Sequence, residues 1–444
     1  MPILPIPSLQ ALVTKVVKTT APEAAKPNNR QHLLHYLLKG LGQLPTPLLE
    51  RLNHSLNAPT AKQYPHADAH LRLIIALNSK LKRPLQLNQL IKLRHKFATD
   101  AVALQAPKVW QQPDAGIDIE TNTDVKSKTK KSALSKGLIV SWKDKNIANA
   151  DGGDMTIRCY QEQDSNQQNP NKHNTDKIAM LFFHGGGFCI GDVDTHHEFC
   201  HAVCAKTGWV VVSVDYRLAP EHSAPTALRD CLTAYKWLAE HCYTLDVLPS
   251  RIVLSGDSAG GCLAILVAQQ VTAPNVTQWL DSGLDAETTT NLLQDLPPPL
   301  AQLPLYPVTD IEADYPSWGL YGQGLLLDHD DIEVFDAAYM QHSFLTRSHA
   351  LISPMHGNNT NMCPSYIVAA ELDILRDEAL AYAAQLQEDD IESKTHTVLG
   401  APHGFIHLMS IHQGLGREID YIINEFADFV LQIIDTEANS IPSK

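Results

Sequence analysis

The first quarter of the chain carries apolar side chains at a helical period. Leucines recur every three or four residues in His32–Leu38 and again in Pro47–Leu56. This spacing places apolar side chains along one face of a helix. The same period continues over 67–81 and 87–104, which Pro84 separates. We therefore expect a series of amphipathic helices at this end of the chain.

The remainder of the chain contains short apolar runs that stop abruptly at glycine or at a polar residue. Three such runs are Ile178–Phe183, Arg251–Ser255 and Ser365–Ala370, and a fourth segment, 392–399, alternates apolar and polar positions. Runs of this length bounded by turn residues predict strands. Helical segments follow two of them, at 262–268 and 380–386.

One serine lies between a predicted strand and a predicted helix. The segment Gly256-Asp257-Ser258-Ala259-Gly260 follows the apolar run that ends at Ser255. A strand that turns sharply into a helix has room only for small residues on either side of the turn, and its serine projects above the sheet edge. Ser258 is therefore the candidate nucleophile, although the five-residue pattern alone also occurs in ordinary turns.

A second glycine-rich segment follows the strand predicted at 178–183. It reads His184-Gly185-Gly186-Gly187-Phe188. Backbone N–H groups aimed at a developing oxyanion stabilise it by about 3 kcal/mol each, and glycine lets the backbone approach the substrate closely. We predict an oxyanion hole made by the N–H groups of Gly186, Gly187 and Ala259. The alternative of a phosphate-binding loop is disfavoured, because the glycine spacing of such loops is absent.

A serine nucleophile needs a base, and the base needs an acidic partner. Asp373 follows the strand predicted at 365–370, and His403 lies at the end of the loop 400–403 after the alternating segment. We therefore predict Asp373 as the acid and His403 as the base, with Glu371 and Asp377 as rival acids. The order serine, aspartate, histidine is the order of the α/β-hydrolases.

Together these segments resemble the bacterial relatives of hormone-sensitive lipase, the family IV esterases. The matching segments are His184–Phe188, Gly191-Asp192 with Thr195-His196, Asp215–Glu221, Gly256–Gly261, Glu371–Asp373 before Leu375–Asp377, and His403–Phe405. The resemblance implies an α/β-hydrolase fold with a mostly parallel central sheet flanked by helices and a helical cap. It also implies hydrolysis of short to medium acyl esters by Ser258, Asp373 and His403, without metal or organic cofactor. Ala224, where an aromatic residue is usual, and the long stretch 272–299 depart from the family pattern.

The resemblance also suggests how the chain is divided. We expect an N-terminal helical region over residues 1–118, made of an extension and part of the cap, then a polar linker over 119–136. The catalytic domain would cover 137–444, with a cap insertion at about 312–356. A second polar segment, 161–176, reads as a surface loop. Whether the N-terminal region is a separate domain stays open at this point.

Charge divides the chain unevenly. Residues 1–110 hold 15 basic and 4 acidic residues, a net charge of +11, so the net charge of −14 for the whole chain leaves −25 for residues 111–444. We favour docking of the basic helical region on the acidic catalytic domain. Peripheral contact with an anionic membrane is the second interpretation. Nucleic acid is not expected as a partner, because the chain is acidic overall and shows no binding motif.

Composition fits a globular protein, with 44% hydrophobic and 19% charged residues in 444. The eight cysteines show no close-spaced pairs, which favours free thiols in a reducing compartment. No apolar run is long enough to span a bilayer, and Met1–Ser8 lacks the basic segment of a signal peptide. We expect a soluble cytoplasmic protein that acts on small-molecule esters as a monomer or homodimer.

Several residues admit plainer interpretations. His196, His197, Cys200, His201 and Cys204 have helical spacing that could suit zinc, but we expect no metal site. We expect Arg217 and Glu221 to form structural ion pairs, His184 to orient the glycine loop and Asp257 to brace the turn. Phe188 and Tyr216 are candidate walls of the substrate site. An amidase or deacetylase with the same triad, and a binding module without catalysis, remain the alternative functions.

Overall fold

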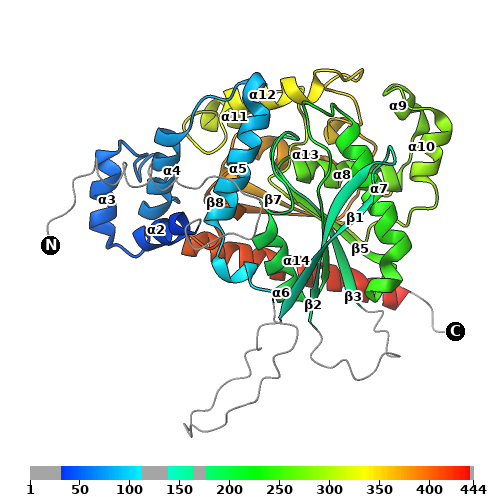
Figure 1. The fold of residues 1–444 in the computed structure, drawn as a ribbon, viewed down its shortest axis with the longest axis horizontal. Helices are drawn as coiled ribbons and strands as arrows, with labels where there is room; N and C mark the ends of the chain where they lie inside the picture. The colour runs from blue at the N-terminus through cyan, green and yellow to red at the C-terminus, as the bar shows by residue number, and fades with distance from the viewer. Residues whose placement is uncertain (1–31, 113–138, 164–176, 441–444) are drawn as a thin grey trace, which may run out of the picture.

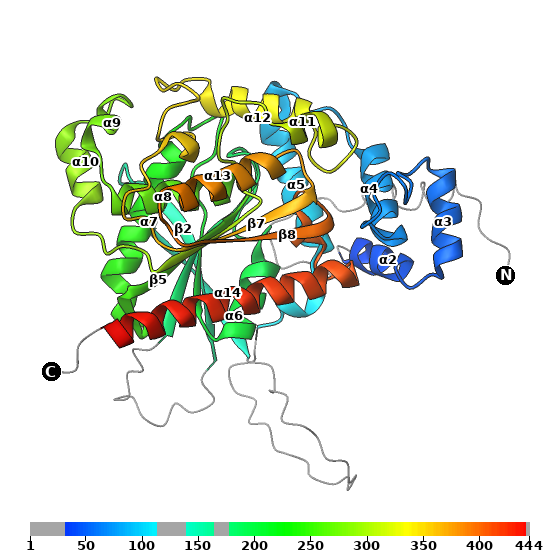
Figure 2. The same cartoon turned by 180° about the vertical axis from the view of Figure 1, so that it is seen from behind.

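The computed structural model describes residues 32–112, 139–163 and 177–440, which form one eight-stranded sheet with helices on both sides (Figures 1 and 2). The strands are β1 (Val140–Ala148), β2 (Asp154–Glu162), β3 (Lys177–Phe183), β4 (Val210–Val214), β5 (Val247–Asp257), β6 (Ala301–Leu305), β7 (Ser365–Leu372) and β8 (Ser393–Pro402). Their order is β1-β2-β4-β3-β5-β6-β7-β8. β1 and β2 are antiparallel to their neighbours, and the other strands are parallel. The predicted mostly parallel sheet is confirmed.

Both faces of the sheet are buried, as the apolar runs require. In β3, Ile178, Met180 and Phe182 belong to one hydrophobic cluster. The residues between them, Ala179, Leu181 and Phe183, belong to the other. Successive side chains of a strand point to opposite faces, so a run that is apolar at every position marks a strand covered on both sides.

Two sets of helices provide that cover. Apolar residues of α6 (His197–Thr207) and α14 (Gln413–Ser440) join the first cluster. Apolar residues of α7 (Thr226–His241), α8 (Ala259–Thr272) and α13 (Arg376–Glu388) join the second. Figure 2 shows α14 running beneath the sheet on the side of α6. Helices on both faces of a parallel sheet make this an α/β fold.

The N-terminal helices match the periodic segments of the sequence. They are α2 (Leu33–Leu41), α3 (Thr46–Ser55), α4 (Ala69–Leu81), the 3-10 turn η1 (Leu87–Gln89), α5 (Leu90–Leu104) and the 3-10 turn η2 (Pro107–Trp110). Buried leucines of α2, α3 and α4 belong to the first hydrophobic cluster, which also contains α14 and the face of the sheet that α14 covers. This part of the N-terminal region therefore shares a hydrophobic core with the sheet, while the domain boundaries at 118 and 136 stay predictions.

The segment between β6 and β7 lies above the carboxyl ends of the parallel strands. It contains α11 (Pro316–Tyr321), α12 (His329–Met340) and the 3-10 turn η4 (Pro354–His356), and α11 and α12 lie at the top of Figure 1. The long stretch between α8 and β6 forms two further helices, α9 (Val276–Leu280) and α10 (Ala286–Leu293). The remaining 3-10 turns are η3 (Cys242–Leu245) and η5 (Phe405–Leu408).

Ion pairs join the basic N-terminal helices to the rest of the chain. Lys82 pairs with Asp328 at 2.7 Å and also with Asp331 on α12. Arg94 on α5 pairs with Glu221 at 2.8 Å. Surface ion pairs each contribute little, but every one of these joins a basic side chain of the N-terminal region to an acidic side chain of the rest of the chain, which agrees with the docking interpretation.

Some details differ from the sequence-based expectations. β8 continues to Pro402, so the residues from Gly400 onward that were predicted as a loop are strand. α13 begins at Arg376, because acidic residues in its first turn suit a helix N-terminus. The linker 119–136 and most of the polar segment 161–176 lie outside the described residues. Within the described part of the chain, no helix is both long and apolar enough to cross a membrane.

The packing of α14 gives a test of the core. The ring of Phe426 is 1% exposed and lies 5.9 Å, between centroids, from the ring of Trp209. We expect Phe426→Ala to lower the free energy of unfolding by about 3–5 kcal/mol, because it leaves a cavity under the sheet. Urea unfolding followed by circular dichroism measures this change. Leu431→Ala is the control, since Leu431 lies on the same helix but is 51% exposed, and equal losses in both variants would contradict this packing.

Candidate active site

Three predicted site residues each follow directly on a strand of the parallel sheet. β5 ends at Asp257, β7 at Leu372 and β8 at Pro402, so the next residues are Ser258, Asp373 and His403. Parallel strands bring their carboxyl ends to one edge of a sheet, where open α/β sheets form their sites. Residues 115 and 145 positions from the serine along the chain therefore meet there.

The three side chains form one hydrogen-bonded chain. Nε2 of His403 lies 2.9 Å from Oγ of Ser258, and Nδ1 lies 2.7 Å from Oδ2 of Asp373. The backbone N–H of Leu375 donates to the other carboxylate oxygen of Asp373 at 2.9 Å. The Asp373 side chain is fully buried, whereas that of His403 is 13% exposed. This arrangement has the imidazole donate from Nδ1 to the carboxylate and leaves Nε2 to accept from the serine hydroxyl.

The backbone at Ser258 makes the sharp turn that the sequence predicts. Ser258 has φ 55° and ψ −120°, a strained conformation for a residue with a side chain. Its N–H donates to the carbonyl of Leu305 at 2.9 Å, which fixes the turn to β6. A Cβ on Gly260 would lie 1.9 Å from the carbonyl oxygen of Phe183, so only glycine fits at this contact between α8 and β3.

The glycine loop lies next to this turn. Gly186 and Gly187 have φ values of 116° and 57°, which favour glycine. The N–H of Gly185 donates to Oδ1 of Asp257 at 2.7 Å, and Nδ1 of His184 donates to the carbonyl of Gly185 at 2.9 Å. Among the described loop and turn residues, the N–H groups of Gly186 and Gly187 donate to no backbone carbonyl, and Ala259 is the first residue of α8. Their role as an oxyanion hole stays a prediction.

The buried carboxylate of Asp257 lies between the turn at Ser258 and the glycine loop. Burial acts to raise the pKa of Asp257, but the neighbouring imidazoles of His196 and His407, together with the N–H of Gly185, lower that pKa to about 2. Nε2 of His196 lies 3.0 Å from Oδ1 of Asp257. Burial also lowers the pKa of His184 and of His407 to about 3. The carboxylate of Asp257, the residue before Ser258, therefore binds the glycine loop, and His184 contacts that loop as an uncharged imidazole.

The rival acids lie elsewhere in hydrogen-bonded pairs. Glu371 accepts from Nδ1 of His66 at 2.7 Å and from the N–H of Gly400 at 2.5 Å. Asp377 pairs with the neighbouring guanidinium of Arg376 at 2.7 Å. The structure therefore brings Asp373, and neither rival, to the histidine.

The predicted structural ion pairs are present, each with a partner that the sequence did not indicate. Arg217 pairs with Asp230 at 2.8 Å and with Asp151 at 2.6 Å. Glu221 pairs with Arg94 on α5. Both residues therefore brace loops at the sheet edge.

Phe188 and Tyr216 are packed behind the glycine loop. Phe188 is 3% exposed and stacks on Tyr339 of α12, with 3.9 Å between ring centroids. Tyr216 is 2% exposed, stacks on His184 at 4.2 Å and donates its hydroxyl to the His184 carbonyl at 2.6 Å. Both support the loop, and their role as walls of the substrate site stays a prediction.

The five-residue set weighed for zinc does not assemble. Of its members only His196 joins a group with metal-ligand geometry in the described residues, namely His196, Asp257 and His407. His197 uses its two ring nitrogens otherwise, with Nδ1 3.0 Å from the Tyr160 hydroxyl and Nε2 2.9 Å from the Val109 carbonyl. A second group, His329, Asp330 and Glu333, is largely exposed.

Two aromatic residues near the site were not singled out from the sequence. The ring of Tyr306 lies 4.9 Å from that of His403, between centroids, and its hydroxyl lies 3.4 Å from Asp257. Phe335 of α12 lies against Gly187. Tyr306 directly follows β6, as Ser258, Asp373 and His403 follow their strands. That position after an apolar run could have identified Tyr306 from the sequence. Nothing local in the sequence marks Phe335.

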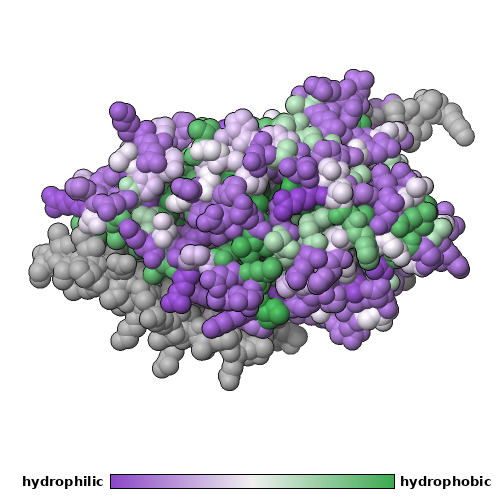
Figure 3. All heavy atoms as spheres, turned by 90° about the horizontal axis from the view of Figure 1, so that it is seen from above, coloured by the Kyte–Doolittle hydropathy of each residue, from purple (hydrophilic) through white to green (hydrophobic). Residues whose placement is uncertain are grey.

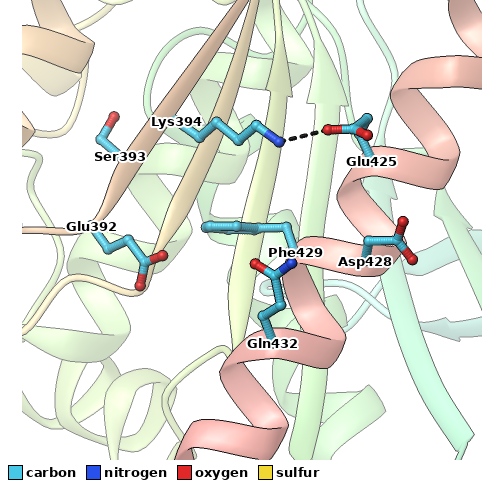
Figure 4. A pocket seen from close by; sticks show the side chains of 7 residues that line it. All are labelled: Glu392, Ser393, Lys394, Glu425, Asp428, Phe429 and Gln432. Atoms are coloured by element: carbon cyan, nitrogen blue, oxygen red, sulfur yellow. Dashed lines mark hydrogen bonds and ion pairs between the residues drawn. The ribbon is translucent and has the colours of Figure 1, made fainter.

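A pocket of about 250 Å³ lies between β8 and α14 (Figure 4). Its lining residues are Glu392, Ser393, Lys394, Glu425, Asp428, Phe429 and Gln432. Lys394 pairs with Glu425 across it at 2.7 Å. Because it lies at the start of β8 and His403 follows the other end, this pocket is separate from the candidate active site.

A serine on a sharp strand-to-helix turn, with histidine and aspartate at neighbouring strand ends of a mostly parallel sheet, defines the α/β-hydrolase class. Residues 180–407 match the family model of the alpha/beta hydrolase fold. The chain is 62% identical to "Lipase 2" of Moraxella sp. (strain TA144), with 99% of each chain covered. It is 31% identical to "Ethyl acetate hydrolase" of Pseudomonas putida over 60% of this chain and 76% of that one.

Solved structures agree with these relatives. An esterase of the archaeon Pyrobaculum calidifontis superposes with a TM-score of 0.62 at 25% identity, covering 82% of this chain and 98% of that one. The chain therefore belongs to the α/β-hydrolase family, in its hormone-sensitive-lipase-like branch. It is a carboxylic ester hydrolase.

The contact at Gly260 gives a test of the turn. We expect Gly260→Ala to lower kcat/KM for an ester at least about 100-fold, because displacement of the turn by about 1 Å misplaces the serine. Gly319→Ala is the control, since nothing lies within 4 Å of a Cβ at that helical glycine. It should leave kcat/KM unchanged and stabilise the fold slightly. Steady-state rates and thermal unfolding check both variants, and a fully active Gly260→Ala enzyme would contradict the close packing.

Proposed function

We propose that Ser258, His403 and Asp373 hydrolyse carboxylic esters of short to medium acyl chains through an acyl-serine intermediate. The hydrogen-bonded chain from Oγ of Ser258 to Nε2 of His403, and from Nδ1 to Oδ2 of Asp373, carries this proposal. It joins a nucleophile, a base and an acid in the geometry that acyl transfer requires.

In the first half of the reaction, Oγ of Ser258 attacks the ester carbonyl carbon while Nε2 of His403 takes the hydroxyl proton. The carbonyl oxygen becomes an oxyanion, which accepts hydrogen bonds from the N–H groups of Gly186, Gly187 and Ala259. His403 then gives its proton to the leaving alcohol as the bond between carbon and alkoxide oxygen breaks. An acyl-serine remains.

In the second half, His403 takes a proton from water, whose oxygen attacks the acyl carbon. The resulting oxyanion accepts hydrogen bonds from the same three N–H groups. The bond to Oγ of Ser258 breaks, His403 returns the proton to that oxygen, and the carboxylic acid leaves. Throughout, buried Asp373 holds Nδ1 protonated and stabilises the imidazolium.

The same side chains could act on amides or on acetyl groups. The match to "Lipase 2" and "Ethyl acetate hydrolase" favours esters. Parallel assays with a matched ester and anilide separate these alternatives. A binding module would bind such compounds without turnover. Treatment with an organophosphonate separates the two, because only an active serine hydrolase is expected to be labelled stoichiometrically at Ser258.

The triad gives the main test. We expect Ser258→Ala to lower kcat by about 10⁴–10⁶-fold and Asp373→Asn by about 10⁴-fold, because the imidazole loses its correct tautomer. Ser255→Ala is the control, since Ser255 lies on the same strand and donates to the Leu303 carbonyl at 2.8 Å, away from the triad. It should retain kcat within a few-fold. Full activity of Ser258→Ala, measured by release of nitrophenol, would refute the proposal.

We further propose a cytoplasmic monomer or homodimer that contacts anionic membranes peripherally. All eight cysteines are free, which suits a reducing compartment. Between Asp68 and Asp100 the chain has no acidic residue. Leu87 and Ile91 are 39% and 50% exposed near basic side chains such as Lys92. Figure 3 shows apolar patches among polar side chains on the face that carries the cap helices.

The membrane contact has its own test. We expect Lys92→Glu to weaken sedimentation with phosphatidylserine-containing vesicles about 10-fold, since each basic side chain near such a surface contributes about 1 kcal/mol and charge reversal adds repulsion. Lys143→Glu, on the exposed part of β1, is the matched control and should bind as the wild type does. Equal binding to vesicles of phosphatidylcholine alone would rule out the electrostatic contact. Sedimentation equilibrium without lipid gives the oligomeric state.

A further inference from the structure

The cap helix α12 presents two aromatic side chains to the glycine loop. Phe335 and Tyr339 are four residues apart, so they lie on the same face of the helix, one turn from each other. Tyr339 is 1% exposed and stacks on Phe188. Phe335 is only partly buried and packs at the margin of the same hydrophobic cluster. The contact of Tyr339 with Phe188 therefore lies in the interior, whereas part of the Phe335 side chain is exposed.

The ring of Phe335 occupies the space directly outside Gly187. A Cβ on Gly187 would lie 2.4 Å from Cγ and 2.6 Å from Cδ2 of Phe335. The ring is therefore in van der Waals contact with a proposed donor of the oxyanion hole. Because an oxyanion lies about 3 Å from its donors, the first carbons attached to the reacting carbonyl come within reach of this ring.

α12 is fixed at both ends, so Phe335 is part of a firm wall. At its start, Lys82 pairs with Asp328 and Asp331. At its end, the N–H of Ala224 donates to the carbonyl of Tyr339 at 2.9 Å. Between them, Sγ of Cys189 lies 3.8 Å from the Phe335 carbonyl. These contacts hold the backbone of α12 at Phe335 beside the glycine loop.

We infer that Phe335 is a specificity-determining residue. Its ring limits the length of whichever substituent of the ester, acyl chain or alcohol, extends from the carbonyl past Gly187. This inference rests on the proposed function, because it takes Gly187 as an oxyanion donor. A substituent longer than the distance between the ester carbonyl and the Phe335 ring must either bend or push α12 away. Each methylene that a hydrophobic site accepts or rejects changes kcat/KM by about 10-fold or more.

The test compares Phe335→Ala and Phe335→Leu with the wild type in two ester series. One series varies the acyl chain of p-nitrophenyl esters from butyrate to octanoate, and the other varies the alcohol of acetate esters. For each series we compare kcat/KM for the longest ester with kcat/KM for the shortest. We expect Phe335→Ala to raise this long-to-short ratio at least 10-fold in one series, and Phe335→Leu to give a ratio between those of the wild type and Phe335→Ala. The series that responds identifies the substituent that contacts the ring.

Phe344→Ala is the matched control. Phe344 lies in the same cap segment but is 85% exposed, so both ratios should stay within 2-fold of the wild type. A merely structural role of Phe335 would lower all rates by one factor and leave both ratios unchanged, and that result overturns the inference. Since each ratio is measured on one preparation, partial unfolding does not affect it. Organophosphonate labelling of Ser258 in the same preparations shows separately whether the proposed nucleophile is correct.

Discussion

The close approach of α8 to β3 is the constraint on which the site depends. At Gly260 the backbone of the helix contacts the carbonyl of Phe183 with no room for a side chain. This contact sets where the helix begins, and so forces Ser258 into a conformation with positive φ that points its hydroxyl toward His403. The strain at Ser258 persists because the surrounding hydrogen bonds and buried side chains leave no other conformation open to it.

The same region carries the support for the glycine loop. Asp257 precedes the serine, and its carboxylate accepts from Gly185 and lies beside His196. A buried carboxylate without partners would be costly, whereas here its partners lower its pKa. One residue of β5 thus lies next to Ser258 in the chain and also holds the glycine loop beside it, which couples the two segments.

The N-terminal helices and the segment between β6 and β7 complete this arrangement. Arg94 of α5 donates to the carbonyls of Cys189 and Ala219 and pairs with Glu221. Lys82 fixes the start of α12. The basic charge of the first part of the chain is therefore partly used to hold loops and helices around the site, and the space left to a substrate depends on segments that are far apart in sequence.

The amino-acid sequence by itself determined the N-terminal helices, the four strands that precede the site segments (β3, β5, β7 and β8) and the three residues that now form one hydrogen-bonded chain, because hydrophobic periodicity and turn glycines are local signals. Ser258, Asp373 and His403 were placed from their positions after strands, and the acid was chosen over Glu371 and Asp377 by resemblance alone. The tertiary structure decided the partners: His66 for Glu371, Arg94 for Glu221, and Tyr339 for Phe188. It also decided that Phe335 meets Gly187. Contacts between distant segments depend on how helices pack on the sheet, and no local pattern of side chains encodes that packing.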